Sequence, residues 1–398
     1  MKKLLSLILT VVLVFSLVAC TSDSSTDGDQ PASGDNVIKI GVFEPVTGEN
    51  GGGGFQEVLG IRYAHQLTNT VEIGGEEYTI ELVEVDNKSD RTEAVTVASN
   101  LVAQNVSAII GSYGSGVSIA AGPTYEEAQI PAVAPSATNP QVTLGNEYYF
   151  RVCFLDPFQG EVMANYAFQD GLTKAAVITQ LGDDYSSGLG NFFLKAFEEL
   201  GGEIVSEQQF QTGDTDFKAI LANVKNAEPD VIFAPSSVAT APLLIKQARE
   251  LGIEAKIMAG DTWENQAIID NAGADAEGVA LSTFFDENDT SSPLAGEFVT
   301  GFKEFLNGND EYLNKNGGDG VAAVSALGFD AYNVVVEAIK VAQSSDSVAI
   351  KDALKGLSLD GVTGSISFDE NGDAKKDMAY IKIIQDGKFM FDKTVKTQ

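Results

Sequence analysis

The sequence predicts an α/β protein with two lobes, each built on a doubly wound parallel sheet. Two observations support this prediction. Short apolar runs alternate with amphipathic helical segments along the chain, as they do in parallel sheets that carry helices on both faces. The chain also has 398 residues, which is enough for two hydrophobic cores. We expect it to cross between the lobes near Asp156, Phe285 and Gly361, so that three segments form a hinge.

The first lobe is predicted to comprise residues 37–155 and 286–362. Short apolar or alternating runs predict its strands, and longer amphipathic runs predict its helices. We expect the strands at 37–43, 78–85, 108–110, 130–134 and 148–154, and the helices at 57–67, 92–105, 117–128, 292–306, 321–342 and 348–357.

The second lobe is predicted to comprise residues 156–285 and 363–398, where strands and helices alternate again. We expect its strands at 175–179, 203–210, 231–234 and 256–259, and its helices at 158–168, 189–200, 217–224 and 239–251. Three last strands, at 364–368, 378–385 and 388–392, complete this lobe. An Asp-Gly turn at residues 386–387 joins the final two.

Residues 1–20 have the layout of a signal peptide. Lys2 and Lys3 precede an apolar run over residues 4–18, and Leu-Val-Ala-Cys at 17–20 resembles a bacterial lipobox. This resemblance implies cleavage before Cys20 and a lipid on that cysteine; a plain signal peptide or an uncleaved membrane anchor is the alternative. We therefore expect the protein outside the cytoplasm, anchored by lipid to the outer face of the cell membrane.

Residues 21–36 contain no large apolar side chain, so we expect a flexible tether between the anchor and the folded body. A lipidated Cys20 would leave Cys153 as the second of two cysteines without a partner. We therefore predict no intramolecular disulfide, and a buried, strand-located Cys153.

The chain is strongly acidic, with a formal net charge of −32. Removal of Lys2 and Lys3 with the signal peptide makes the mature chain more negative still. Nucleic acids and anionic membrane surfaces would repel such a protein. We expect no nucleic-acid partner, and membrane attachment only through the lipid.

Two loops in the first lobe are suited to bind an anion. One follows the strand that ends at Ile110 and leads to Ser115, which stands where a helix N-cap belongs. The other covers residues 135–139, and Pro140 has the backbone angle that a helix start requires. Both loops leave carboxyl ends of parallel strands, the edge at which open α/β sheets bind ligands. Free N–H groups at helix starts favour a carboxylate or a phosphate there.

These residues also carry a family resemblance. Gly-x3-Ser at 111–115 and Pro-Ser-Ala-Thr-Asn-Pro at 135–140 resemble the ligand-binding core of the leucine/isoleucine/valine-binding protein family, the type I periplasmic binding proteins. The resemblance extends from about residue 37 to the C-terminus. It implies that a ligand's α-carboxylate docks at the first lobe, on Ser115, Ser136, Ala137 and Thr138.

The resemblance places two further ligand contacts in the second lobe. Tyr185 aligns with a cleft tyrosine of the family, and Asp261 with the acidic residue that holds the ligand's α-ammonium. The residues alone leave alternatives open: a loop tyrosine that only packs, and an aspartate that caps a helix before Glu264.

The chain departs from the family pattern at Gly53, because many members carry an aromatic residue there that covers the ligand. Gly53 lies in a glycine-rich stretch at 45–55, predicted as a loop that either approaches the ligand or is exposed on the surface. The identity of the ligand's side chain therefore stays open.

Motifs for enzymatic chemistry are missing from the sequence. The chain has no P-loop, and its glycine runs do not complete G-x-G-x-x-G after a strand. Ser115 fails the G-x-S-x-G pattern, and the single histidine, His65, has no clustered metal-ligand partners. We therefore expect no enzyme, no cofactor and no metal.

The resemblance thus implies an extracytoplasmic solute-binding lipoprotein of an ABC importer. Its expected ligand is an amino acid, first of all a branched-chain one, and its expected partners are the permease subunits in the membrane. We expect a monomer whose lobes close over the ligand. The alternatives are an amide, urea or aromatic-acid ligand, or a sensing role in which the protein presents its ligand to a membrane receptor.

Overall fold

The computed structural model describes residues 36–289 and 293–396, and of Lys396 the backbone only. The predicted signal peptide, Cys20 and nearly all of the tether lie outside the described residues. From Val37 onward the chain packs as one compact unit. No helix within the described ranges combines the length and the apolar character that a membrane crossing requires.

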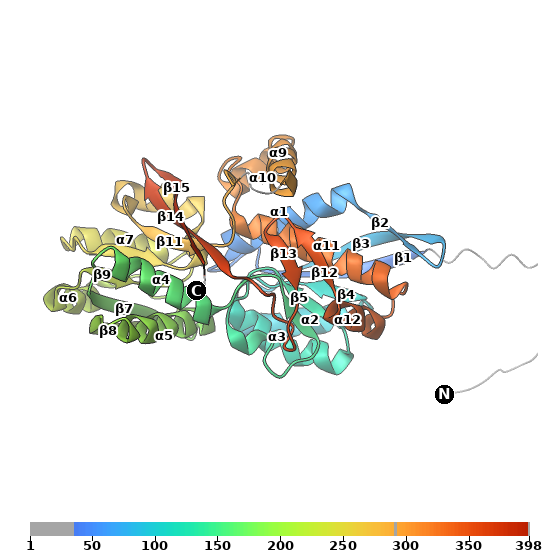
Figure 1. Cartoon of the computed structure of the whole chain (residues 1–398), viewed down its shortest axis with the longest axis horizontal. Coiled ribbons are helices and arrows are strands. Elements are labelled where there is room, and N and C mark those ends of the chain that lie inside the picture. The colour runs from blue at the N-terminus through green and yellow to red at the C-terminus, as the bar shows by residue number, and fades with distance from the viewer. Residues whose placement is uncertain (1–35, 290–292, 397–398) are drawn as a thin grey trace, which may run out of the picture. The chain divides into compact units, whose positions relative to one another are not determined.

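A six-stranded sheet forms the first half of this unit (Figure 1). Its order is β2-β3-β1-β4-β5-β6, and all neighbours pair in parallel except β2 and β3. Its strands are β1 (Val37–Glu44), β2 (Thr70–Ile73), β3 (Glu76–Asp86), β4 (Ala108–Ile110), β5 (Ala132–Ala134) and β6 (Tyr149–Arg151). The helices between them are α1 (Gly51–Leu67), α2 (Arg91–Ala103) and α3 (Ser115–Ala128), and α11 (Ala323–Ala342) and α12 (Ser347–Lys355) follow later in the chain.

A seven-stranded sheet forms the other half, in the order β15-β14-β11-β10-β9-β7-β8. Its strands are β7 (Lys174–Leu181), β8 (Glu203–Gln211), β9 (Val231–Phe233), β10 (Lys256–Ala259), β11 (Ala280–Thr283), β14 (Met378–Gln385) and β15 (Lys388–Lys396). The first five are parallel, and β14 and β15 add antiparallel partners at one edge. Its helices are α4 (Asp156–Gln169), α5 (Asp184–Glu199), α6 (Lys218–Ala227), α7 (Ala241–Glu250) and α8 (Gln266–Ala272).

Each sheet has a hydrophobic core on both faces, as a doubly wound sheet requires. Successive strand residues point to opposite faces, so Ala175 and Val177 of β7 join one apolar cluster and Ala176 and Ile178 join another. The six-stranded sheet divides its apolar side chains in the same way. The predicted α/β fold with two parallel sheets is confirmed.

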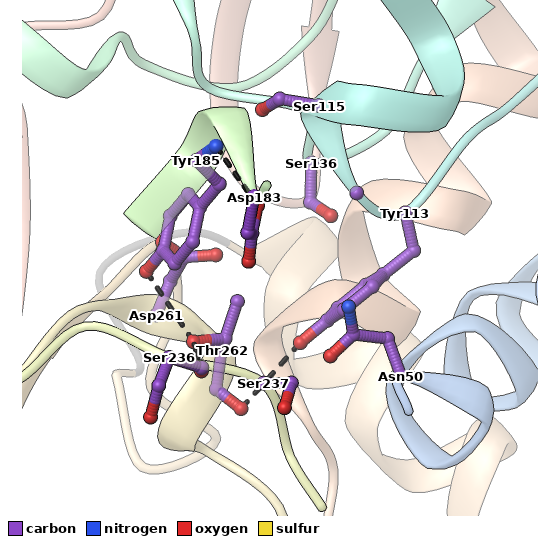
Figure 2. Close-up of a pocket in the computed structure, with 11 residues that line it drawn as sticks. Asn50, Tyr113, Ser115, Ser136, Asp183, Tyr185, Ser236, Ser237, Asp261 and Thr262 are labelled. Atoms are coloured by element: carbon purple, nitrogen blue, oxygen red, sulfur yellow. Dashed lines mark hydrogen bonds between the residues drawn. The ribbon is translucent and has the colours of Figure 1, made fainter. Parts of the chain in front are cut away.

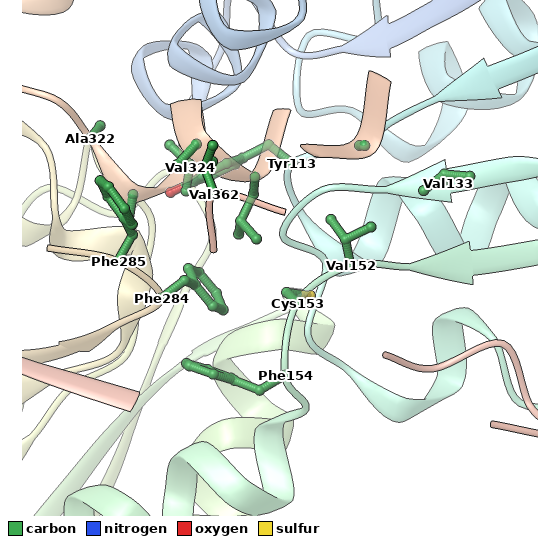
Figure 3. Packing of buried hydrophobic residues seen from close by; sticks show 14 of the residues in the cluster. Tyr113, Val133, Val152, Cys153, Phe154, Phe284, Phe285, Ala322, Val324 and Val362 are labelled. Carbon is green, nitrogen blue, oxygen red and sulfur yellow. The ribbon is translucent and has the colours of Figure 1, made fainter. Parts of the chain in front are cut away.

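Apolar side chains also gather where the chain passes from one sheet to the other (Figure 3). Phe154, after β6, packs on Phe284, after β11, with ring centroids 4.3 Å apart. Cys153 lies beside them, buried and free, after the end of β6 and not within a strand as predicted. The segments that connect the sheets thus pack in one apolar cluster, which holds them in fixed positions relative to each other.

Several predicted elements differ from the structure, and β2, β11 and α8 were not predicted. The glycine-rich stretch is not a loop throughout, because α1 begins at Gly51. A Cβ on Gly54 would lie 2.1 Å from the Pro45 carbonyl oxygen, so only glycine lets this helix turn pack so closely. The strand predicted at 364–368 does not join the last sheet either: β13 (Gly364–Ser367) pairs with β12 (Ser358–Gly361) as a separate hairpin, since a tight turn at 362–363 folds it back.

The helix-to-helix loop predicted at 307–320 contains a short helix as well. This helix, α10 (Asp310–Asn316), follows α9 (Pro293–Asn307). The Asn309 side chain accepts hydrogen bonds from the backbone N–H groups of Glu311 and Tyr312, so it caps the helix start. The Asn309 cap is a local signal for a helix, but the glycines that flank this segment favoured the prediction of a loop.

Candidate ligand-binding site

A narrow cavity lies between the two sheets, at the carboxyl ends of their strands (Figure 2). Segments that follow strands of the six-stranded sheet contribute Asn50, Tyr113, Gly114, Ser115 and Ser136 to its wall. Segments that follow β7, β9 and β10 contribute Asp183, Tyr185, Ser236, Ser237, Asp261 and Thr262. The cavity therefore occupies the edge at which parallel α/β sheets bind their ligands.

On the side of the six-stranded sheet, the cavity faces the start of α3. This helix begins at Ser115, and its N-cap is Gly114 and not Ser115 as predicted. Gly114 has a φ of 98°, which favours glycine. The Ser115 hydroxyl accepts a hydrogen bond from the Asn139 N–H at 3.2 Å, so the two predicted loops touch each other. The first amide groups of α3, together with this hydroxyl, make a site for a carboxylate.

The second loop contributes less of the wall than we predicted. Ser136 lines the cavity and donates a hydrogen bond to the Glu57 carboxyl. Ala137 and Thr138 are buried behind the wall, at 1% and 0% exposed, and are not among the lining residues. The structure thus gathers Ser115, Ser136, Tyr185 and Asp261 around the cavity and places the other two predicted residues behind it.

Asp261 is buried, and its carboxyl is held by two side chains. Its Oδ1 accepts hydrogen bonds from Gln159 Nε2 at 2.8 Å and from the Tyr185 hydroxyl at 3.0 Å. Burial raises the pKa of the Asp261 carboxyl to about 6, while these two hydrogen bonds lower it. The N-cap of the short helix at 261–263 is Gly260, so Asp261 does not occupy the capping position that we weighed as an alternative.

Gln159 and Trp263 have roles that the sequence left undecided or unnoticed. Gln159, on α4, also donates to the Ser282 hydroxyl at 2.9 Å, and it thus fixes Asp261 against the seven-stranded sheet. In the sequence, only its place one turn after a predicted crossing pointed to Gln159. Trp263 is completely buried and donates to the Ser236 carbonyl at 3.2 Å, so it packs behind the wall.

A buried arginine, which the sequence analysis missed, holds the second loop in shape. Arg151 is fully buried at the end of β6. Its Nη1 donates to the carbonyl oxygens of Ala137 at 2.7 Å and Asn139 at 2.8 Å, and its Nε donates to Asp373 at 2.5 Å. A cation inside an apolar strand must be paired, and this was the signal that could have found it.

Two further buried carboxyls lie beneath the cavity. Burial raises the pKa of the Glu57 carboxyl to about 8, and burial and the neighbouring Glu57 raise that of Glu44. Glu44 accepts a hydrogen bond from the Tyr113 N–H at 2.6 Å, and Glu57 accepts one from Ser136. The pair supports both loops of the first wall, and at neutral pH it carries less negative charge than two free carboxylates would.

The two walls are joined by direct hydrogen bonds around the cavity. Gln180 Nε2 donates to Glu49 at 2.8 Å, and the Val238 N–H donates to the Asn50 side chain at 3.2 Å. On the other side, Asn139 Nδ2 donates to the Asp184 carbonyl at 2.8 Å. These bonds connect loops of different sheets, so the structure is a closed arrangement of the cavity.

Comparisons with known proteins agree with this geometry. A family model described as periplasmic binding protein matches residues 37–388. The Leu/Ile/Val-binding protein homolog 1 of Brucella melitensis is 30% identical over 341 residues, which cover 85% of this chain and 88% of that protein. A leucine-, isoleucine-, valine-, threonine- and alanine-binding protein of Pseudomonas aeruginosa is 26% identical, over 85% of this chain and 88% of that protein.

Solved structures give the same picture. A leucine-binding protein of Thermotoga maritima has a TM-score of 0.83 and 36% identity, over 90% of this chain and 99% of that one. A branched-chain amino acid substrate-binding protein of Streptococcus pneumoniae, solved with isoleucine, has a TM-score of 0.81 and 31% identity, over 91% of this chain and 100% of that one. The chain therefore belongs to the periplasmic binding protein family, groups with Leu/Ile/Val-binding protein homologues, and is a solute-binding protein of the ABC-transporter type rather than an enzyme.

Proposed function

We propose that the chain is an extracytoplasmic lipoprotein that binds an α-amino acid and delivers it to the membrane subunits of an ABC importer. One observation carries the choice of ligand. The buried carboxyl of Asp261 lines one side of the cavity, and the start of α3 with Ser115 lines the other. An α-amino acid brings an ammonium for the first and a carboxylate for the second, so both charges are compensated when water leaves.

Ligands without a cation fit this cavity less well. A benzoate-binding solute protein of R. palustris shares the fold at 20% identity and a TM-score of 0.77, which speaks for the fold alone. An aromatic acid or a neutral amide would leave the Asp261 charge without a partner in a closed cavity, and that is costly. The named relatives make branched-chain amino acids the first ligands to test.

The ligand would act by bridging the two walls. Ser115 and the α3 start belong to one sheet, and Asp261 and Tyr185 to the other, so a bound amino acid adds contacts that exist only when the cavity is closed. Such a ligand shifts the equilibrium towards the closed form by its differential affinity for that form. The importer's membrane subunits would recognise that form, and the protein would work as a monomer. A sensing role would use the same closure.

We expect amino acids to stabilise the purified protein against heat. A ligand at a hundred times its Kd adds about 2.7 kcal/mol to the unfolding free energy, which raises the melting temperature measurably. Differential scanning fluorimetry with the common amino acids, several amides and several aromatic acids measures this. Stabilisation by amides or aromatic acids alone would refute the amino-acid ligand.

The membrane anchor is the second part of the proposal, and Cys20 is the residue that carries it. With Cys20 lipidated, residues 21–36 act as the tether to the folded body. The β12–β13 hairpin spans the predicted lobe boundary at 362–363, so the last crossing lies later, between β13 and β14. We expect Cys20→Ala to move the protein from the membrane fraction to the soluble fraction, with its ligand response unchanged. Retention of the variant in the membrane fraction would point to the uncleaved anchor instead.

A further inference from the structure

We infer that the ligand's side chain carries a hydrogen-bond donor, and that Asp183 receives it. This inference rests on the proposed function, because it takes the amino-acid end groups as bound at Ser115 and Asp261. It concerns the rest of the cavity, where the ligand's side chain must lie. The donor can be a hydroxyl, an amide N–H or an ammonium.

The wall around the side-chain space is polar. None of the described residues that line the cavity has an aliphatic side chain. Ser236, Ser237 and Thr262 bring hydroxyl groups, Asn50 brings an amide, and Asp183 brings a carboxyl. The hydroxyls of Ser236, Ser237 and Thr262 already have hydrogen-bond partners within the protein. The carboxyl of Asp183 is therefore the group that an enclosed branched aliphatic side chain would deprive of water, and burying a charge without a partner is costly.

The aromatic part of the wall does not make up for this. A Cβ on Gly53 would lie 2.4 Å from Tyr113 Cζ, so the Tyr113 ring fills the space directly above that glycine. Its hydroxyl reaches the Thr262 carbonyl of the opposite wall at 3.4 Å. The ring therefore ends in a polar contact with the opposite wall. It takes up part of the space for a ligand side chain and does not extend an apolar pocket.

Asp183 is the charged group of this wall. It is the N-cap of α5, and its Oδ1 accepts the Tyr185 N–H at 3.0 Å. Figure 2 shows its carboxyl directed towards the space between Ser136, Tyr113 and Thr262. No lysine or arginine is found among the lining residues in the described part of the chain, so the protein supplies no cation for Asp183 inside the cavity. A donor on the ligand would supply the missing partner.

Matched pairs of amino acids test the inference, because each pair differs by one polar group. Isothermal titration of the full-length protein in detergent would compare threonine with valine, asparagine with leucine, and lysine with norleucine. We expect the polar member of at least one pair to bind about tenfold tighter or more. The pair with the largest ratio then identifies the donor as hydroxyl, amide or ammonium.

The outcomes separate this inference from the proposed function. Binding of valine and leucine as tight as that of their polar partners, or tighter, would overturn the inference and leave an amino-acid-binding protein. Failure of every amino acid to bind would remove the proposed function, and the inference with it.

Asp183→Asn tests the residue itself. Asparagine caps a helix as well as aspartate does, so the variant removes the charge and keeps the start of α5. We expect the polar-over-apolar ratio to fall at least about fivefold, with the affinity for the apolar member unchanged. Asp270→Asn, an exposed site on α8, is the control and should keep the ratio. Asp183→Ser, which can also cap a helix, provides a second variant if Asp183→Asn does not fold, and an unchanged ratio in the variant that folds would overturn the assignment.

Discussion

Replacement of Asp261 by asparagine is expected to weaken amino-acid binding by at least about thirtyfold. The carboxyl is 3% exposed, and it is the group that would compensate the ligand's ammonium once the cavity closes. Loss of one partner of a buried, hydrogen-bonded charge pair costs about 2–5 kcal/mol, and about 1.4 kcal/mol is a tenfold change in affinity. Isothermal titration of the variant measures the loss.

The pH profile gives a second readout of the same variant. Because burial holds the pKa of Asp261 at about 6, lowering the pH through 6 protonates the carboxyl and removes its charge. We expect the affinity of the wild-type protein to fall over this range. The pKa of Asp183 is also raised to about 6, chiefly by burial, so the part of the pH effect that disappears in Asp261→Asn belongs to Asp261.

Asp270→Asn is the matched control for Asp261→Asn, since it removes an aspartate from the exposed side of α8. It should leave both the affinity and its pH dependence unchanged. If Asp261→Asn binds amino acids as tightly as this control does, Asp261 has no part in the site, and the proposal that it pairs with the ligand's α-ammonium is wrong.

The two parallel sheets and most of their strands and helices could be predicted from the sequence because period and length are local signals, but the short elements β2, β11, α8 and α10 were missed. The loops at 111–115 and 135–140 fall at strand ends in the structure as predicted. The start of α1 could not be read in the same way. Glycine has a poor helix propensity, and the need for it shows only in the packing of Gly54 on Pro45 and of Gly53 on Tyr113.

The part of the candidate site that would face the ligand's side chain could not be predicted, for a different reason. Four separate loops contribute Asn50, Tyr113, Asp183 and the neighbours Ser236 and Ser237, and each is an ordinary surface residue when its own segment is considered alone. Tyr113 becomes part of a wall only because Gly53, distant in sequence, leaves room for its ring. Such an arrangement depends on contacts between elements, which a pattern within one segment does not contain.

Replacement of Arg151 by methionine is expected to have the largest effect on stability, with a loss of about 3–5 kcal/mol in the free energy of unfolding. The methionine keeps much of the apolar volume but leaves Asp373, whose side chain is 10% exposed, without its cation. It also removes the donors for the carbonyl oxygens of Ala137 and Asn139. Urea denaturation, with the m-value compared between variants, measures the change.

Lys218→Met is the matched control, because Lys218 and Glu250 form an exposed pair at 3.9 Å with side chains 60% and 57% exposed. Such a pair contributes about 0–1 kcal/mol, so the control should unfold nearly as the wild-type protein does. The double variant Arg151→Met with Asp373→Leu should recover part of the loss, since it also removes the uncompensated carboxylate. Equal stability of Arg151→Met and Lys218→Met would show that the buried pair does not support the fold.

The position of Asp373 gives the Arg151 variant a second expected effect, on the ligand. Asp373 lies between β13 and β14, in the segment that leads the chain to the seven-stranded sheet, while the carbonyl groups that Arg151 holds belong to the loop beside Ser136. One side chain thus fixes the loop at 135–139 to a connection between the sheets. We expect Arg151→Met to weaken amino-acid binding even at temperatures where it is fully folded. Unchanged affinity there would confine the arginine to a role in stability.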